Sequence, residues 1–186
     1  MKRLLSLILI LLSVFPITRG QEFQRTSAQK AVMLSGDILV FAAPVAGIIT
    51  GLAMHDWQGI KQEAFTGLTA IGTTFVLKYT VNKTRPDFSN NHSFPSMHTS
   101  VSFAGAAYIQ RRYGWGWGIP AYALSVYVGW SRIYAKKHDI WDVIAGAAIG
   151  IGSAYIYTRP FAKKHKLSIC PMTDGDHMGV YANLTF

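Results

Sequence analysis

The stretch SRIYAKKHDIWDVIAGAAIGIGSAYIY, residues 131–157, passes from charged to apolar within a few positions. Its first part places three cations, a histidine and two aspartates beside an apolar run. Such charges are costly to desolvate unless they are paired, hydrated or used. The second part, Ile140–Tyr157, is long and apolar enough for a membrane helix, and Gly146 and Gly150 have the spacing of packed membrane helices. The stretch therefore predicts a membrane helix preceded by a loop that is either simply solvated or an anion site.

Four other internal segments share this apolar character, namely Ala31–Met54, Ala64–Val81, Met97–Gln110 and Trp115–Trp130. Their lengths favour helix over strand, and Gly47 and Gly51 repeat the spacing of small residues at helix contacts. Tryptophans stand at several segment ends, as they do at membrane interfaces. The chain is thus expected to be all-α, a polytopic membrane bundle with five or six transmembrane helices.

The two ends of the chain differ from this pattern. Residues 1–20 have two cations, a short apolar core and small residues up to Gly20, which fits either a cleaved signal peptide or a first anchor helix. Residues 21–166 hold the internal apolar segments and are expected to form the helical bundle. Residues 167–186 are a polar tail that alternates toward its end, which predicts a short strand or an extended arm.

Composition supports a membrane partner rather than nucleic acid. The chain is 50% hydrophobic and 15% charged, with a formal net charge of +9. The cations lie in short loops between apolar runs, as at anionic lipid surfaces. No basic helix or aromatic-basic repeat is present, so no nucleic-acid partner is expected. Among the loop cations, Lys83, Lys136 and Lys137 are expected to contact lipid headgroups.

Two polar loops, 82–96 and 131–139, are separated by two crossings and must share one face of the membrane. If residue 21 lies outside the cytoplasm, both loops lie outside, and the cations of the 111–113 turn and of the tail lie inside, as the positive-inside tendency prefers. The outer loops carry cations although the positive-inside tendency disfavours them there, so these cations are expected to serve another purpose.

The cations of this shared face suit a phosphoryl group. Lys78, Arg85 and Arg132 offer one compact charge and two bidentate forks for the negative equatorial oxygens of phosphate in transfer. Ser96, at the start of a helix, and the backbone N–H groups after it would add neutral donors. Asp37 is interpreted only as a carboxylate in the first turn of its segment.

Two histidines could carry the chemistry. His138 and Asp142 are four residues apart, so at a helix start they share a face, and the carboxylate would orient the ring while its other nitrogen attacks phosphorus. His98 comes from another segment and suits protonation of the leaving oxygen. Phosphate ester hydrolysis is the natural reaction class for this arrangement.

The strings KYTVNKTRP (78–86), PSMH (95–98) and SRIYAKKHDIWD (131–142) resemble the three-part motif of the type 2 phosphatidic acid phosphatase superfamily, K-x6-RP, PSGH and SR-x5-H-x3-D. Spacing and order match, and only Met97 departs, standing in place of glycine. The resemblance implies that Lys78, Arg85, Arg132, Ser96 and the backbone at Met97 bind phosphate. It also implies that His98 is the general acid and that His138, held by Asp142, forms a phosphohistidine without a metal or other cofactor.

The expected protein is therefore a metal-independent lipid phosphatase in a bacterial inner membrane, with its site facing the periplasm or exterior. Its substrate would be a lipid phosphomonoester or pyrophosphate, such as undecaprenyl pyrophosphate, phosphatidylglycerol phosphate, phosphatidate or a lipid A phosphate. Membrane lipids are its other expected partners, and the oligomeric state stays open.

Several alternatives stay open from the sequence alone. A secreted acid phosphatase or a vanadate-dependent haloperoxidase of the same superfamily would share the cradle but not the apolar helices. A non-catalytic phospholipid-binding or transport protein would use the cations without the histidine chemistry. A zinc hydrolase could use His92, His98 and His138, although their spacing matches no familiar zinc site.

Overall fold

The computed structural model describes residues 23–161, 166–173 and 178–185. The predicted signal or anchor segment, residues 1–20, lies outside these ranges. The described residues form, in order, α2 (Ser27–Leu39), α3 (Ala42–Ala53), α4 (Trp57–Thr80), α5 (Met97–Tyr113), α6 (Trp115–Tyr134), α7 (Ile140–Tyr157), β1 (Lys166–Thr173) and β2 (Met178–Thr185).

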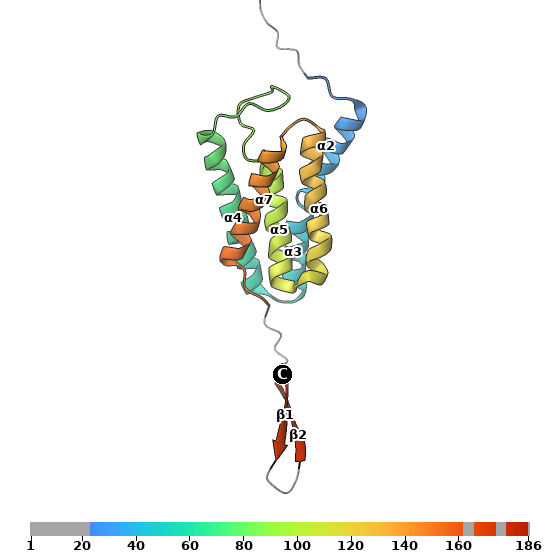
Figure 1. Ribbon diagram of the computed structural model, residues 1–186, viewed down its shortest axis with the longest axis vertical. Helices are drawn as coiled ribbons and strands as arrows, with labels where there is room; N and C mark the ends of the chain where they lie inside the picture. Colours follow the sequence, from blue (N-terminus) through green and yellow to red (C-terminus); the bar gives the residue numbers. More distant parts are fainter. Residues whose placement is uncertain (1–22, 162–165, 174–177, 186) are drawn as a thin grey trace, which may run out of the picture.

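The helices form a bundle with α5 at its centre (Figure 1). Helix α5 packs against α3, α4, α6 and α7, and most of its side chains are buried. The loop between α4 and α5 and the loop between α6 and α7 meet at the upper end in Figure 1, while the α3–α4 and α5–α6 turns lie at the lower end. The two predicted polar loops therefore share one end of the molecule.

Four helices begin at a side chain that caps exposed backbone N–H groups, as helix N-termini require. The capping residues are Thr26, Asp56, Ser96 and Asp139. Between α5 and α6 the chain reverses at Gly114, whose φ of 97° is readily adopted by glycine. These local signals set where the helices start, and three of them (Asp56, Ser96 and Asp139) stand at the end of a loop.

The segment Ala31–Met54, expected as one helix, is two helices separated by a turn at Val40 and Phe41. Proline explains the break, because Pro44 has no N–H and its ring would clash with the carbonyl four residues earlier in a continuous helix. Pro44 instead sits in the first turn of α3, where it is tolerated.

Two other predicted boundaries were wrong. Helix α4 begins at Trp57 rather than Ala64, because Asp56 caps it and accepts a hydrogen bond from the Gly59 N–H. Helix α6 continues to Tyr134, so Ser131 and Arg132 lie in its last turn rather than in a loop. It ends where Lys136 adopts a φ of 57°.

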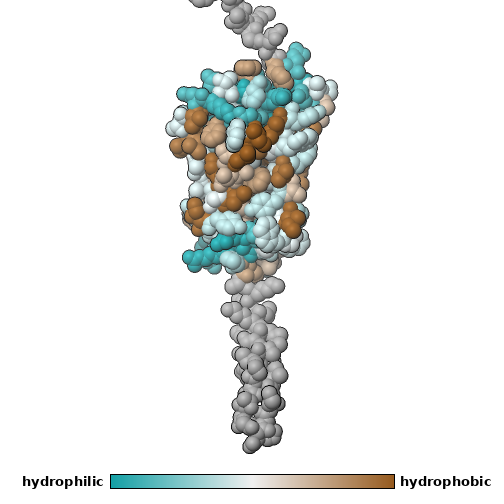
Figure 2. Space-filling view, in the orientation of Figure 1, coloured by the Kyte–Doolittle hydropathy of each residue, from teal (hydrophilic) through white to brown (hydrophobic). Residues whose placement is uncertain are grey.

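On the face seen in Figure 2, apolar side chains gather over the middle of the bundle, between hydrophilic residues at its two ends. On α4 alone, Phe65, Leu68, Phe75 and Val76 are each more than half exposed. Two stretches have the length and hydropathy of membrane spans, α2 with α3 (Ser27–Ala53) and α7 (Ile140–Tyr157). An apolar belt between two polar ends is the surface that a bilayer requires.

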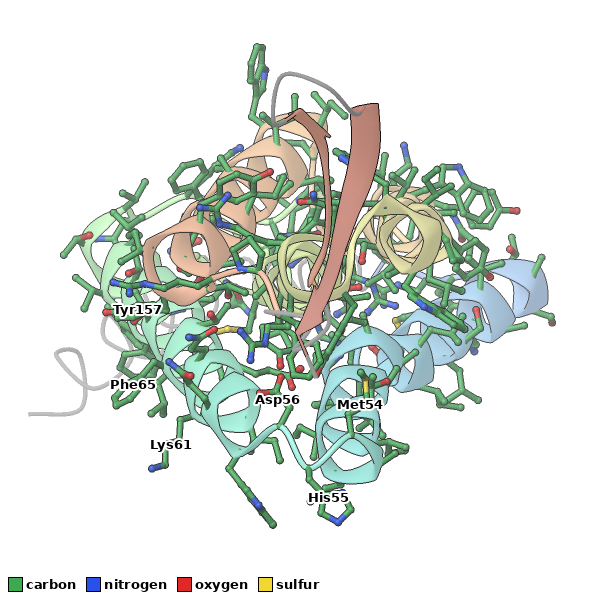
Figure 3. All side chains as sticks on the ribbon, turned by 90° about the horizontal axis from the view of Figure 1, so that it is seen from below. Met54, His55, Asp56, Lys61, Phe65 and Tyr157 are labelled. Atoms are coloured by element: carbon green, nitrogen blue, oxygen red, sulfur yellow. The ribbon has the colours of Figure 1, made fainter. Side chains whose placement is uncertain are left out.

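A buried ion pair lies at the lower end of the bundle. Arg112 of α5 donates from Nη2 to Oδ1 of Asp56 at 2.5 Å and from Nε to Oδ2 at 2.7 Å, and both side chains are buried. Seen from below in Figure 3, Asp56 points into the bundle, whereas His55 and Lys61 point outward. This pair ties the α3–α4 turn to the end of α5.

The tail was expected to hold a strand or an extended arm, and it forms two strands. β1 and β2 pair antiparallel, with Lys166 opposite Thr185 and Thr173 opposite Met178. A partner strand satisfies the backbone groups that a lone strand would leave unpaired.

Candidate active site

A cavity of about 280 Å³ lies at the end of the bundle where the two polar loops meet. It is lined by Met33, Asp37, Lys78, Arg85, Met97, His98, Arg132, Lys137 and His138. Six of the eight residues proposed from the sequence are in this set. The other two, Ser96 and Asp142, lie behind the lining residues, fully buried.

His138 and Asp142 are placed as their spacing predicted. Nδ1 of His138 is 3.3 Å from Oδ2 of Asp142. The same carboxylate accepts a hydrogen bond from Lys83 Nζ at 2.7 Å, another from the Asp139 N–H at 3.2 Å, and a short one from the Ser93 hydroxyl. With Nδ1 directed to Asp142, Nε2 of His138 is the nitrogen left to act as a nucleophile.

The surroundings of His138 favour its neutral form. Burial lowers its pKa, and the nearby cations Arg85 and Lys78 lower it further, whereas the contact with Asp142 acts in the opposite direction. The net result is a pKa below the ordinary value of histidine. A neutral imidazole has the lone pair that attack on phosphorus needs.

Three cations from separate elements converge on the cavity. Lys78 donates to the backbone carbonyls of His92 and Pro95 at 2.9 and 3.0 Å, which leaves one of its three N–H groups free for an anion. Among the described residues, Nε of Arg85 is buried without a hydrogen-bond partner. Arg132, with a nearly buried side chain, uses part of its five-donor fork on α2 and Ser131. These unused donors are available to hydrogen-bond a negatively charged oxygen group.

Ser96 and Met97 form the start of α5 beside the cavity. The Ser96 hydroxyl accepts from the Thr99 N–H at 3.4 Å, and the Ser96 N–H donates to the Asp142 carbonyl at 2.9 Å. Met97, in place of the motif glycine, lines the cavity with His98. The first N–H groups of α5 thus stand beside the cavity, and a helix N-terminus favours negative charge.

Asp37 is a site residue that the sequence reasoning missed. Its Oδ1 is 2.5 Å from Nη1 of Arg132 and 2.9 Å from Nε2 of His98. The one signal in the sequence was an acidic residue near the start of an otherwise apolar segment, because ionisable residues in membrane helices are usually functional. Its partners are far away in the sequence, so no spacing pattern could name them.

The expectation that Lys83, Lys136 and Lys137 contact headgroups was wrong for Lys83. Its ammonium bridges Asp139 and Asp142 at 2.5 and 2.7 Å. Lys137 lines the cavity and pairs with Asp87 at 3.1 Å, while Lys136 is exposed. The loop cations thus include two that build or border the site.

No set of zinc ligands is found among the described residues. Within residues 23–161 and the two strands, no three His, Cys, Asp or Glu side chains are grouped as a metal site would need. The ring of His92 packs against Tyr79, with 4.8 Å between ring centroids, and does not line the cavity that holds His98 and His138.

Sequence comparison relates this chain to known phosphatases. The sequence profile of the PAP2 superfamily matches residues 63–166. The lipid A 4'-phosphatase of Helicobacter pylori is 30% identical over 155 residues, which cover 77% of each chain. A lipid A 1-phosphatase from the same species is 28% identical over 169 residues, covering 84% of this chain and 85% of the relative.

The fold has a solved counterpart. The crystal structure of a transmembrane PAP2 type phosphatidylglycerolphosphate phosphatase from Bacillus subtilis superposes with a TM-score of 0.56 and 21% identity, over 83% of this chain and 92% of that one. This likeness, with the apolar belt, confirms the predicted membrane bundle of helices. The chain belongs to the PAP2 superfamily.

Proposed function

We propose that this membrane-bound phosphatase removes a phosphate monoester from lipid A through a phosphohistidine intermediate. The observation that carries the proposal is a buried His138, in contact with Asp142, that lines one cavity together with His98, Lys78, Arg85 and Arg132. The lipid A phosphatases among its relatives favour lipid A over the other lipid phosphates. Both a lipid A 4'-phosphatase and a lipid A 1-phosphatase match, so the assay includes lipid A with its phosphate at either position.

In the first step, Nε2 of His138 attacks phosphorus and the bond between phosphorus and the lipid oxygen breaks. The cations hold the equatorial oxygens and offset the charge that spreads over them. His98 gives its proton to the leaving oxygen, so the lipid departs as an alcohol. Asp142 stabilises the positive charge that develops on the His138 ring.

In the second step, water attacks the phosphohistidine and the bond between nitrogen and phosphorus breaks. His98, now neutral, takes a proton from this water, and inorganic phosphate leaves. The sum of the two steps is ester plus water giving alcohol plus phosphate. Lys78, Arg85 and Arg132 serve both steps, because the phosphoryl group keeps its place while the attacking group changes.

The proposed location is a bacterial inner membrane, with the cavity toward the periplasm. The signal-like residues 1–20 support export of the segment after them, and the end opposite the cavity carries Arg111, Arg112 and Arg159. Cations gather at the cytoplasmic ends of membrane helices. A periplasmic cavity would reach a lipid phosphate of the outer leaflet without moving its chains through the bilayer.

The test is phosphate release by the full-length protein in detergent, with EDTA present, from a panel of lipids. The panel holds lipid A with its phosphate at position 1 or 4', phosphatidate, phosphatidylglycerol phosphate and undecaprenyl pyrophosphate. His138→Ala should abolish release, whereas His55→Ala, an exposed histidine at the opposite end, should not change it.

Each other outcome contradicts a stated part of the proposal. Fastest release from a glycerophospholipid or polyprenyl substrate would remove lipid A as the substrate. Loss of release in EDTA would overturn the metal-independent mechanism. Binding of lipids without release by the folded wild type would make the protein a phospholipid-binding or transport protein.

A further inference from the structure

Asp37 joins the cavity from α2, outside the segment that matches the family profile and outside all three motif strings. Its side chain is 39% exposed, whereas that of Arg132, which it contacts, is only 3% exposed. Asp37 therefore presents a carboxylate to the cavity while it is held by a rigid partner. Among the described residues that line the cavity, it is the one acidic side chain.

The position of Asp37 is built into the packing of α2 on α6. Nη2 of Arg132 donates to the Met33 carbonyl at 2.5 Å. A Cβ atom at Gly36 would collide with the Ser131 hydroxyl and with the Arg132 guanidinium, so glycine is needed for this close approach. The helix face that carries Met33, Gly36 and Asp37 is thus fitted to Arg132, and Asp37 is aimed at His98 as a result.

The charges around His98 explain what this carboxylate could do. A general acid must hold its proton until the leaving oxygen takes it. The groups that line the cavity with His98 come from every surrounding element: Lys78 of α4, Arg85 and Lys137 of the two loops, Arg132 of α6 and the His138 ring. Those that carry a charge are cationic, and they disfavour a positive charge on His98. Asp37, 2.9 Å from its Nε2, is the lining group that favours it.

We propose that Asp37 is the positioning residue that orients His98 and favours its protonated form, against the burial and the cations around it, for proton donation to the leaving oxygen. This inference rests on the proposed phosphatase function. The site then holds two carboxylate–imidazole pairs, Asp142 with His138 and Asp37 with His98. The first supports a nucleophile and the second supports an acid.

The same charge must weaken the binding of phosphate. A carboxylate within a phosphate cradle repels the anion and occupies one donor of Arg132. Asp37 therefore favours turnover at the expense of affinity. If Asp37 only supported the fold, the Asp37→Asn substitution would lower both turnover and phosphate affinity or leave both unchanged.

The experiment compares wild type, Asp37→Asn and Ser35→Ala across pH with the best lipid substrate. Ser35→Ala is the matched control, because its hydroxyl contacts Tyr127 of α6 at 2.7 Å outside the cavity. For Asp37→Asn we expect kcat to fall roughly 10- to 100-fold, a part of what general acid catalysis contributes. We also expect the basic limb of the pH profile to move to lower pH, because His98 loses the carboxylate that favours its proton.

Binding of inorganic phosphate, measured by calorimetry on the same proteins, is the second readout. Asp37→Asn should bind phosphate more tightly than wild type, and Ser35→Ala should bind it equally. An unshifted basic limb, or weaker phosphate binding by a folded Asp37→Asn protein, would overturn the inference. An inactive wild type would instead refute the proposed function, so the two failures can be told apart.

Discussion

The imidazole of His138 shows how single residues at this site depend on contacts from distant elements. Its orientation comes from Asp142, whose carboxylate is in turn held by Lys83 from the α4–α5 loop. Lys83 and Asp142 are separated by 59 positions. A lysine that the sequence suggested as a headgroup contact thus helps to hold His138 in place, because an unpaired buried carboxylate at Asp142 would be costly.

The pH dependence of activity follows from the environment of His138. Histidine attacks phosphorus only when it is neutral, and its ordinary pKa is about 6.5. Burial lowers the pKa of His138, so the neutral form persists to lower pH. We therefore expect the acidic limb of kcat/KM for wild type to lie below pH 6.5, as measured by initial rates in detergent.

Two controls keep this prediction specific. A phosphate monoester titrates near pH 6 itself, so the ionisation of the substrate is measured separately and included in the fit. Thermal unfolding at each pH shows whether the protein stays folded. An acidic limb above pH 6.5 in the folded protein would contradict the assignment of a buried, neutral His138 as the nucleophile.

At the scale of helices, glycines set how closely the central elements approach. The predicted spacing of Gly146 and Gly150 is realised at the contact of α7 with α5. A Cβ atom at Gly146 would lie 2.6 Å from the Ser96 carbonyl oxygen, and one at Gly150 would lie 2.7 Å from the Ala104 nitrogen. This approach brings the start of α5, with Ser96, against the start of α7, with Asp142.

Substitution on α7 can test this packing with a control on the same helix. Gly150→Ala should destabilise the protein by about 1–3 kcal/mol, because overpacking of a tight contact forces the backbones apart. Nothing lies within 4 Å of a Cβ atom at Gly152, so Gly152→Ala should be neutral or slightly stabilising. Thermal unfolding in detergent measures both, and equal unfolding temperatures for the two variants would refute the close packing.

At the scale of the whole molecule, the bundle has two different polar ends. One end holds the cavity, and the other is closed by the buried Asp56–Arg112 pair. Burial alone would raise the pKa of Asp56, but the hydrogen bonds from Arg112, the Gly59 N–H and Tyr113, together with the charge of Arg112, outweigh burial and hold this pKa below its ordinary value. Asp56 therefore remains a charged partner of Arg112, at the end proposed to face the cytoplasm.

Cysteine labelling can test the proposed orientation of these ends. In a Cys170→Ser background, Asn90→Cys marks the exposed loop beside the cavity, and Lys61→Cys marks the opposite end. A membrane-impermeant maleimide should label Asn90→Cys in spheroplasts and should label Lys61→Cys only after permeabilisation. The reverse pattern would place the cavity on the cytoplasmic face.

Local sequence determined much of this protein. Apolar runs predicted the helices, and the motif spacing identified His138, Asp142, His98 and the three cations as candidate site residues. Both signals depend only on residues a few positions apart in the chain. Pro44 also signalled a helix break in the sequence, although the segment Ala31–Met54 was predicted as one helix. Starts of helices were less predictable, because a cap such as Asp56 looks like any other polar loop residue.

Only the tertiary structure decided which distant groups meet. Asp37 and Arg132 are separated by 95 positions, and Lys83 reaches Asp142 across two helices. Such pairs depend on how α2 and α7 pack against their neighbours, and that packing is set by many small contacts at once, including those of Gly36 and Gly150. A short motif describes residues that share one stretch of backbone, whereas the charge balance of the cavity is a property of the assembled bundle.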